Sequence, residues 1–86
     1  MNDDELFRAL GFVKVSQFRI DTLKAIGNSF KMPSEIAGEI DLTTSQVSRI
    51  LIGLKNENIV LCINEDMRKG RLYKCTQLGI EVLKNL

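Results

Sequence analysis

Apolar side chains recur at helical spacing along most of the chain. One buried helix face needs apolar residues at i, i+3, i+4 and i+7, and the clearest set is Val47, Ile50, Leu51 and Leu54. Similar spacing predicts helices over residues 3–10, 16–27, 33–40, 44–58 and 77–85. The pattern therefore indicates a mainly helical domain.

Several residues predict where these helices begin and end. Gly11 is expected to end the first helix, because glycine is a poor helix former. Pro33 suits the first turn of the third helix, where its missing N–H is not needed. Thr43 and Gln46 have the spacing of a capping box, so the fourth helix is expected to begin directly after Thr43. Asn58 tolerates left-handed backbone angles and is expected to stop that helix.

Residues 59–63 form a β-rich apolar run, a polar segment over residues 64–70 that contains a glycine follows it, and residues 71–75 suit the returning strand. This arrangement predicts a β-hairpin. A short extended segment over residues 30–32 precedes the proline and offers a third strand. The fold class we expect is therefore α+β, mainly α, with two to three antiparallel strands.

The chain has two cysteines, Cys62 and Cys75, one in each strand of the predicted hairpin. If the hairpin tip lies near residues 68–69, these cysteines face each other across the ladder, and a redox switch is conceivable. Cysteines in such strands are more often small core residues, and we favour that interpretation.

The third and fourth predicted helices are joined by the very short turn Asp41-Leu42-Thr43. Ala37 supplies the small residue that two closely crossing helices require. Counted from Ala37, apolar residues occupy positions −1, +3, +5, +10 and +13 of the helix-turn-helix pattern: Ile36, Ile40, Leu42, Val47 and Ile50. Asp41 stands where the turn usually has glycine, and it also tolerates left-handed angles. The pattern predicts a helix-turn-helix, although any αα-hairpin can show a similar one.

The outward positions of the fourth predicted helix are polar, with short side chains at its start and cations later: Thr44, Ser45, Gln46, Ser48, Arg49 and Lys55. Short side chains let a helix approach DNA closely, and Gln46 or Arg49 can bond a base edge or a phosphate. No acidic residue occurs on this helix before Glu57. Ile52 is the apolar exception, and we expect it to pack on another segment.

The hairpin loop carries a basic cluster, Arg68-Lys69-Gly70-Arg71, shortly after Glu65-Asp66. A basic tip beside a DNA-reading helix can reach a phosphate or a minor groove, although a plain solvated turn is the alternative. The candidate DNA-binding residues are therefore Ser34, Thr44, Ser45, Gln46, Ser48, Arg49, Lys55, Arg68, Lys69 and Arg71.

Three stretches of the chain carry a resemblance to a known family: Pro33-Ser34-Glu35-Ile36-Ala37, Val47-Ser48-Arg49-Ile50-Leu51 and Lys69-Gly70-Arg71-Leu72-Tyr73-Lys74. They resemble winged-helix transcription regulators of the MarR and ArsR type, especially small archaeal members, and the resemblance covers about residues 16–86. It implies a winged helix-turn-helix fold and DNA binding. It also implies that the Val-Ser-Arg segment lies in the recognition helix and that the Gly-Arg-Leu-Tyr segment forms the second strand of the wing.

Composition narrows the class of protein further. A chain of 86 residues is one domain. Its net charge is only +1, but residues 44–86 hold seven Lys and Arg against four Asp and Glu, whereas residues 1–43 hold five against seven. The sequence has no histidine, which removes Ser-His and Cys-His pairs and most zinc sites. We therefore expect no enzyme activity, no cofactor and no metal. The acidic N-terminus and the lack of a long apolar run predict a cytoplasmic protein without a membrane span.

These features predict a sequence-specific regulator that binds double-stranded DNA and acts by promoter occupancy. The alternative is a winged-helix protein–protein interaction module that binds no DNA. Residues 1–14 form an N-terminal helical segment that we expect to contribute to a homodimer contact, and residues 15–86 form the DNA-binding domain. The contact is expected because this segment and the last helix hold more apolar residues than a small core needs; those of the segment are Leu6, Phe7, Leu10, Phe12 and Val13. The alternative is that these residues only cap the core of their own monomer.

Overall fold

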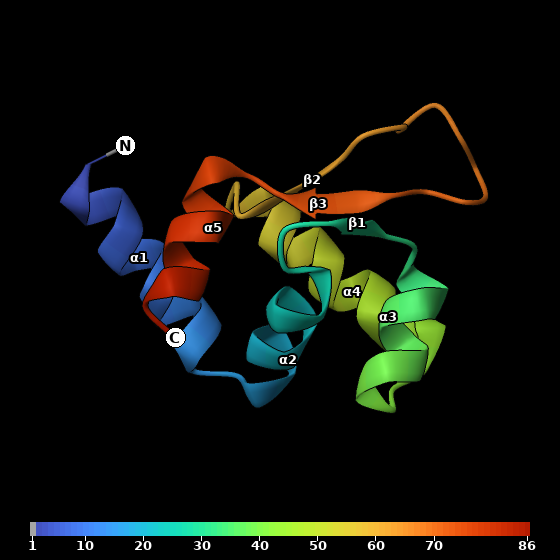
Figure 1. The fold of residues 1–86 in the computed structure, drawn as a ribbon, viewed down its shortest axis with the longest axis horizontal. Helices are drawn as coiled ribbons and strands as arrows, with labels where there is room; N and C mark the ends of the chain where they lie inside the picture. The colour runs from blue at the N-terminus through green and yellow to red at the C-terminus, as the bar shows by residue number, and fades with distance from the viewer. Residues whose placement is uncertain (1) are drawn as a thin grey trace.

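The computed structural model describes residues 2–86, which form helices around a small antiparallel sheet (Figure 1). In chain order the elements are α1 (Asp3–Lys14), α2 (Gln17–Ile26), β1 (Phe30–Lys31), α3 (Pro33–Ile40), α4 (Thr44–Asn56), β2 (Val60–Cys62), β3 (Tyr73–Cys75) and α5 (Gln77–Lys84). The fold is thus α+β and mainly helical, which confirms the predicted class. Every helix in the described range is too short or too polar to cross a membrane.

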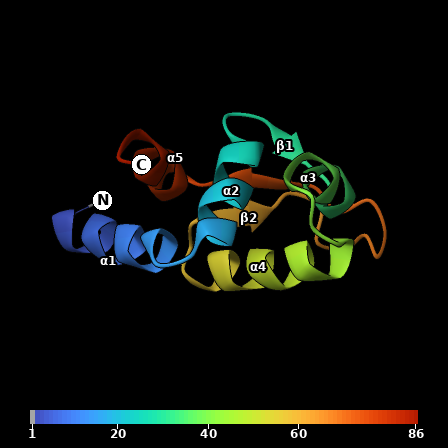
Figure 2. The same ribbon diagram turned by 90° about the horizontal axis from the view of Figure 1, so that it is seen from below.

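The three strands form a sheet in the order β1-β3-β2. The central strand β3 pairs on both sides, so that Lys74 lies opposite Phe30 in β1 and opposite Leu61 in β2. Helices α2, α3 and α4 lie under one face of the sheet, whereas no helix of the described residues covers the other face (Figures 1 and 2). Helices α1 and α5 pack together at the end of the molecule opposite the β2–β3 loop.

The core fills the space between the sheet and the helices beneath it. Its most deeply buried apolar side chains are Val13, Leu23, Ile26, Ile36, Val47, Leu51, Leu54, Ile59, Val60 and Val82. Those on α2, α3 and α4 occupy positions that the helical spacing predicts to face inward. Ile40 and Ile50, which belong to the same spacing, are only partly buried.

The first helix is longer than predicted, because Gly11 does not end it. Helix α1 begins after Asn2, whose side chain accepts a hydrogen bond from the Glu5 N–H (2.8 Å), and it continues to Lys14. A glycine inside a helix costs about 1 kcal/mol relative to alanine. Val13, two residues beyond Gly11, is fully buried, and the helix that continues past the glycine carries it into the core. The burial of Val13 therefore outweighs the low helix propensity of Gly11.

Helices α3 and α4, with the turn between them, form what we call the α3–α4 corner (Pro33–Asn56). Asp41 ends α3 in the left-handed conformation, with φ 60° and ψ 43°. Ala37 is buried, with 5% of its surface exposed, and its carbonyl accepts the Leu42 N–H. The predicted capping box of Thr43 and Gln46 is present at the start of α4. The turn residues thus fix how the two helices meet.

The hairpin register differs from the one that would bring the two cysteines together. Cys62 lies opposite Tyr73, and Cys75 lies opposite Val60, so the cysteines are diagonal neighbours rather than partners. In this register the loop is centred between Met67 and Arg68. Both thiols are free, and burial raises the pKa of the Cys75 thiol to about 11. Cys75 is therefore a poor thiolate at neutral pH, which supports a core role.

Candidate nucleic-acid interface

A groove of about 400 Å³ lies between α4, the first turn of α3 and the β2–β3 loop. Six of the ten predicted site residues line it: Ser34, Thr44, Ser48, Arg68, Lys69 and Arg71. They come from three separate parts of the chain, and the α3–α4 corner and the hairpin bring them together. The remaining lining residues are Met32, Pro33, Ile52, Gly70 and Tyr73. Hydroxyls and cations thus surround a partly apolar floor.

One face of α4 supplies the wall of this groove. Thr44, Ser48 and Ile52 follow one another at four-residue spacing, which places them in line along the helix. Ile52 remains 56% exposed although it lines the groove. Ile52 was expected to pack on another segment, but it stays exposed and adds an apolar side chain to the groove. The contribution of Met32 and Tyr73 to it could not be foreseen, because it depends on how the sheet sits above the corner.

Ser45 and Arg49 lie on α4 outside this groove. Both side chains are exposed, and Arg49 has no ion-pair partner among the described residues. They are one helical turn apart, so they project from the same side of the helix. These two side chains are free to contact a ligand that lies along α4.

Gln46 is occupied by the capping box. Its Oε1 accepts hydrogen bonds from the Thr43 N–H (2.9 Å) and the Thr43 hydroxyl (3.1 Å), while the Thr43 Oγ1 accepts the Gln46 N–H (3.1 Å). The side-chain carbonyl that a base edge would require is therefore engaged, and the amide NH₂ remains for an outside contact.

The β2–β3 loop is held by hydrogen bonds from side chains to its own backbone. Asn64 bonds the far side of the loop twice: its Nδ2 donates to the Gly70 carbonyl (3.0 Å), and its Oδ1 accepts the Leu72 N–H (2.8 Å). The guanidinium of Arg71 donates from Nε to the Met67 carbonyl (2.7 Å) and from Nη2 to the Glu65 carbonyl (3.2 Å). Arg71 therefore has a structural task in the loop, which its position in the sequence did not reveal.

An ion pair between Lys55 and Glu65 ties α4 to the same loop. The hydrogen bond between them raises the pKa of the Lys55 ammonium and lowers the pKa of the Glu65 carboxyl, and their mutual attraction adds to both shifts. The charge of Lys55, predicted to face DNA, is thus balanced within the protein. The partner lies in the loop ten residues along the chain, so neither helical spacing nor local sequence indicated the pair.

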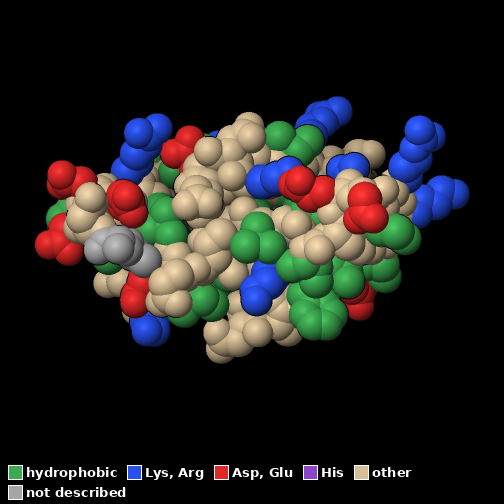
Figure 3. All heavy atoms as spheres, turned by 90° about the horizontal axis from the view of Figure 1, so that it is seen from above, with side chains coloured by type: hydrophobic (Ala, Val, Ile, Leu, Met, Phe, Trp, Pro, Cys, Tyr) green, Lys and Arg blue, Asp and Glu red, His purple; other side chains and the backbone are tan. Residues whose placement is uncertain are grey.

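Arg68 and Lys69 are the free cations of the loop tip (Met67–Gly70). Both are exposed, and neither forms an ion pair in residues 2–86. Figure 3 shows Lys and Arg side chains projecting from the end of the molecule that carries this loop, where acidic side chains are also visible, and a further group of acidic side chains at the opposite end. The first turn of α1, with Asp3, Asp4 and Glu5, lies at that acidic end. Glu65 and Asp66 lie in the same loop as Arg68 and Lys69, so the loop carries both signs of charge and only its tip is purely basic.

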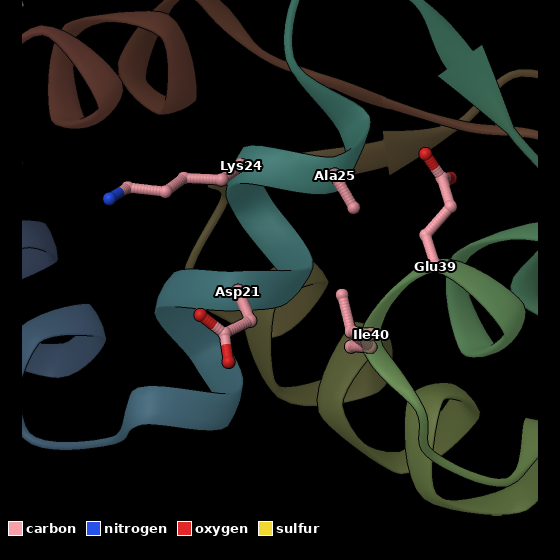
Figure 4. Close-up of a pocket in the computed structure, with 5 residues that line it drawn as sticks. All are labelled: Asp21, Lys24, Ala25, Glu39 and Ile40. Atoms are coloured by element: carbon pink, nitrogen blue, oxygen red, sulfur yellow. The ribbon is translucent and has the colours of Figure 1, made fainter.

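A second hollow, of about 420 Å³, lies between α2 and α3 (Figure 4). Two of its charged groups have partners within the protein: Asp21 accepts a hydrogen bond from the Gln17 side chain within α2 (2.9 Å), and Glu39 of α3 pairs with Lys31 of β1 (2.8 Å). Lys24 points away from Glu39 in this view. Across residues 2–86, no cluster of three or more His, Cys, Asp or Glu side chains is placed to hold a metal ion.

No protein-family model matches the chain, and a search of curated proteins found no match. The geometry of the groove and the charges around it therefore have to indicate the function.

Proposed function

We propose that this protein is a winged helix-turn-helix regulator that binds double-stranded DNA at specific sequences and acts by occupying promoters. The α3–α4 corner is the helix-turn-helix, and the β2–β3 hairpin is the wing. The groove between α4 and the loop, with hydroxyls on one side and cations on the other, is the observation that carries this proposal. Hydroxyls and cations are the groups with which proteins bind the DNA backbone.

In the proposed complex, the first two turns of α4 enter the major groove. A helix with its side chains is about 10–12 Å across, and the major groove is about 12 Å wide. Ser45 and Arg49 then face the base edges, since they are exposed and free of internal partners. The absence of acidic side chains from α4 removes the repulsion that would oppose this approach.

The sugar–phosphate backbone of one strand lies in the groove between α4 and the loop. The hydroxyls of Ser34, Thr44 and Ser48 donate to phosphate oxygens from one side. Arg68 and Lys69 neutralise phosphates from the other side. Ile52, in line with Thr44 and Ser48 on α4, contacts the deoxyribose rather than a base. Lys55 and Arg71 act indirectly, because they hold the loop beside α4.

We further propose that two chains associate through α1 and α5. Phe7 on α1 is 68% exposed and Leu86, just beyond α5, is 36% exposed. A dimer presents two copies of α4 to two half-sites, which raises specificity. Light scattering at micromolar concentration should give the mass of two chains, and the mass of one chain would contradict the dimer.

The direct test is selection of bound duplexes from a pool of random sequence by the full-length protein. A shared motif should be enriched. Arg49→Ala should lower affinity for the selected duplex by about 1–3 kcal/mol and relax one position of the motif. Lys24→Ala, which removes an exposed cation on α2, should change neither. If the pool shows no retention even at low salt, the chain is an interaction module and not a DNA-binding protein.

A further inference from the structure

The outer face of the sheet is apolar and uncovered. Phe30, Lys74 and Leu61 lie side by side across the three strands, because Lys74 pairs with both of the others. Phe30 is 58% exposed and Leu61 is 37% exposed. Ile63 lies two residues beyond Leu61, so it points to the same face, and it is 46% exposed. Figure 3 looks onto this side of the molecule and shows hydrophobic side chains gathered around a basic one.

This outer face is separate from the groove assigned to DNA. Successive side chains of a strand point to opposite faces of a sheet. Tyr73 lines the DNA groove and is buried, so Lys74, the next residue, points the other way. A partner on the outer face therefore need not displace DNA from α4.

Lys74 also borders a polar hollow of about 220 Å³ beside β3. The hollow is lined in part by the side-chain amides of Asn28 and Gln77, which can donate hydrogen bonds. Lys74 itself is exposed and has no ion-pair partner in the described part of the chain. An unpaired ammonium between an apolar face and a hollow of donors suits a carboxylate.

We infer that the outer face, formed by Phe30, Leu61, Ile63 and Lys74, docks a peptide segment of another protein that carries an acidic side chain flanked by apolar ones. The apolar side chains pack on Phe30 and Leu61, and the carboxylate enters the hollow beside Lys74. Covering this face without a carboxylate would bury an unpaired ammonium, which is costly.

Charge also disfavours the other occupants. Two copies of the chain placed face to face would cover both Lys74 ammonium groups, and none of the residues that form either face is an acid that could pair with them. A nucleic-acid strand would find one cation among apolar side chains, whereas backbone binding relies on several cations. An acidic-apolar peptide is the occupant that satisfies both parts of the surface.

The test is selection of random peptides of about twelve residues on the full-length protein. Peptides that lose binding to Leu61→Asp should be enriched in Asp or Glu next to apolar residues. The same selection on Lys74→Glu should enrich Lys or Arg instead, and the original peptides should bind this variant at least about tenfold more weakly. Lys24→Glu, an equal charge reversal on α2, should leave the selected sequences acidic. Leu61 and Lys74 are exposed, and unchanged thermal unfolding confirms that the variants fold.

Three results would overturn the inference. The first is that no peptide depends on Leu61. The second is that enriched peptides lack acids, or stay acidic on Lys74→Glu. The third is that a single-stranded oligonucleotide or a second copy of the chain occupies the face, seen as amide shifts at Phe30 and Leu61 on adding the oligonucleotide or on raising protein concentration. Shifts at these residues on adding the selected acidic peptide, with none at Thr44 to Arg49, would support it.

Discussion

The α3–α4 corner and the β2–β3 loop face the same groove, but different forces hold them in place. The corner rests on buried apolar side chains, among them Ile36, Val47 and Leu51, none of which is exposed. The loop is exposed throughout its tip and is held by the hydrogen bonds of Asn64 and Arg71 and by one ion pair.

This difference determines which polar residues remain free for a ligand. In the corner, packing fixes the backbone, so that Ser45, Ser48 and Arg49 need no internal partner. In the loop, polar side chains build the structure themselves, and Arg71 is engaged by carbonyl groups. A count of basic residues therefore overstates the charge that the loop offers to DNA.

The largest loss of stability is expected from a substitution in the buried core of the corner. Leu51→Ala should lower the free energy of unfolding by about 2–5 kcal/mol, because it removes fully buried methyl groups and leaves a cavity. Ile52→Ala, the next residue, should change it by about 0.5 kcal/mol or less, since Ile52 is 56% exposed. Denaturant unfolding measures both, and equal losses would mean that α4 is rotated from its position here.

A smaller loss is expected at the start of α4. Thr43→Ala should lower the free energy of unfolding by about 0.5–2 kcal/mol, because it removes the side-chain half of the capping box. Thr44→Ala is the matched control and should leave stability within about 0.5 kcal/mol while weakening DNA binding. A stability loss at Thr44 as large as that at Thr43 would assign the cap to the wrong residue.

In the loop, substitutions should show which cations contact phosphates by their charge and which one holds the loop in place. Replacing Arg68 and Lys69 together by alanine should flatten the dependence of log affinity on log salt by about 2, one for each phosphate contact. Arg71→Lys keeps the charge but loses the geometry that reaches two carbonyls, so it should weaken DNA binding with little change in the slope. Full affinity of Arg71→Lys would show that Arg71 serves as a charge and not as a loop support.

The smallest effect on stability is expected at the ion pair between Lys55 of α4 and Glu65 of the loop. The pKa of Glu65 is lowered, so its contribution to stability is present above the ordinary glutamate pKa of 4.5 and is lost as the pH falls through the lower folded-state value. Carboxyl NMR should give Glu65 a midpoint below 4.5, and Lys55→Met should return it to the ordinary range. An ordinary midpoint in the unsubstituted protein would show that the loop is not tied to α4 in solution.

The corner is more predictable from sequence than the loop, because buried apolar side chains hold the corner whereas hydrogen bonds and an ion pair hold the loop. Its caps and its apolar spacing are local, so the residue types alone assign Pro33, Asp41 and Thr43 to their roles. The prediction that Gly11 ends the first helix is wrong, because the burial of Val13 is a tertiary effect that a local preference cannot show.

The loop depends on contacts between residues that are distant in sequence or on side-chain geometry. The pairing of Lys55 with Glu65 follows from how the hairpin folds back over α4. The hairpin register, which separates Cys62 from Cys75, is accompanied by Asn64 closing the loop. Residue types alone mark the loop as basic, and that is sufficient to propose contact with DNA but not to say which cations are free.

In the proposed complex, the α3–α4 corner and the loop tip bind DNA as one surface. Backbone amide shifts of the isotope-labelled full-length chain, recorded while a duplex is added at about 50 mM salt, test it most directly. We expect shifts at Ser34, Thr44 to Arg49 and Arg68 to Gly70, with none in α1 or α5. An absence of shifts at this salt, or shifts confined to α1, α5 or the outer face of the sheet, would contradict it.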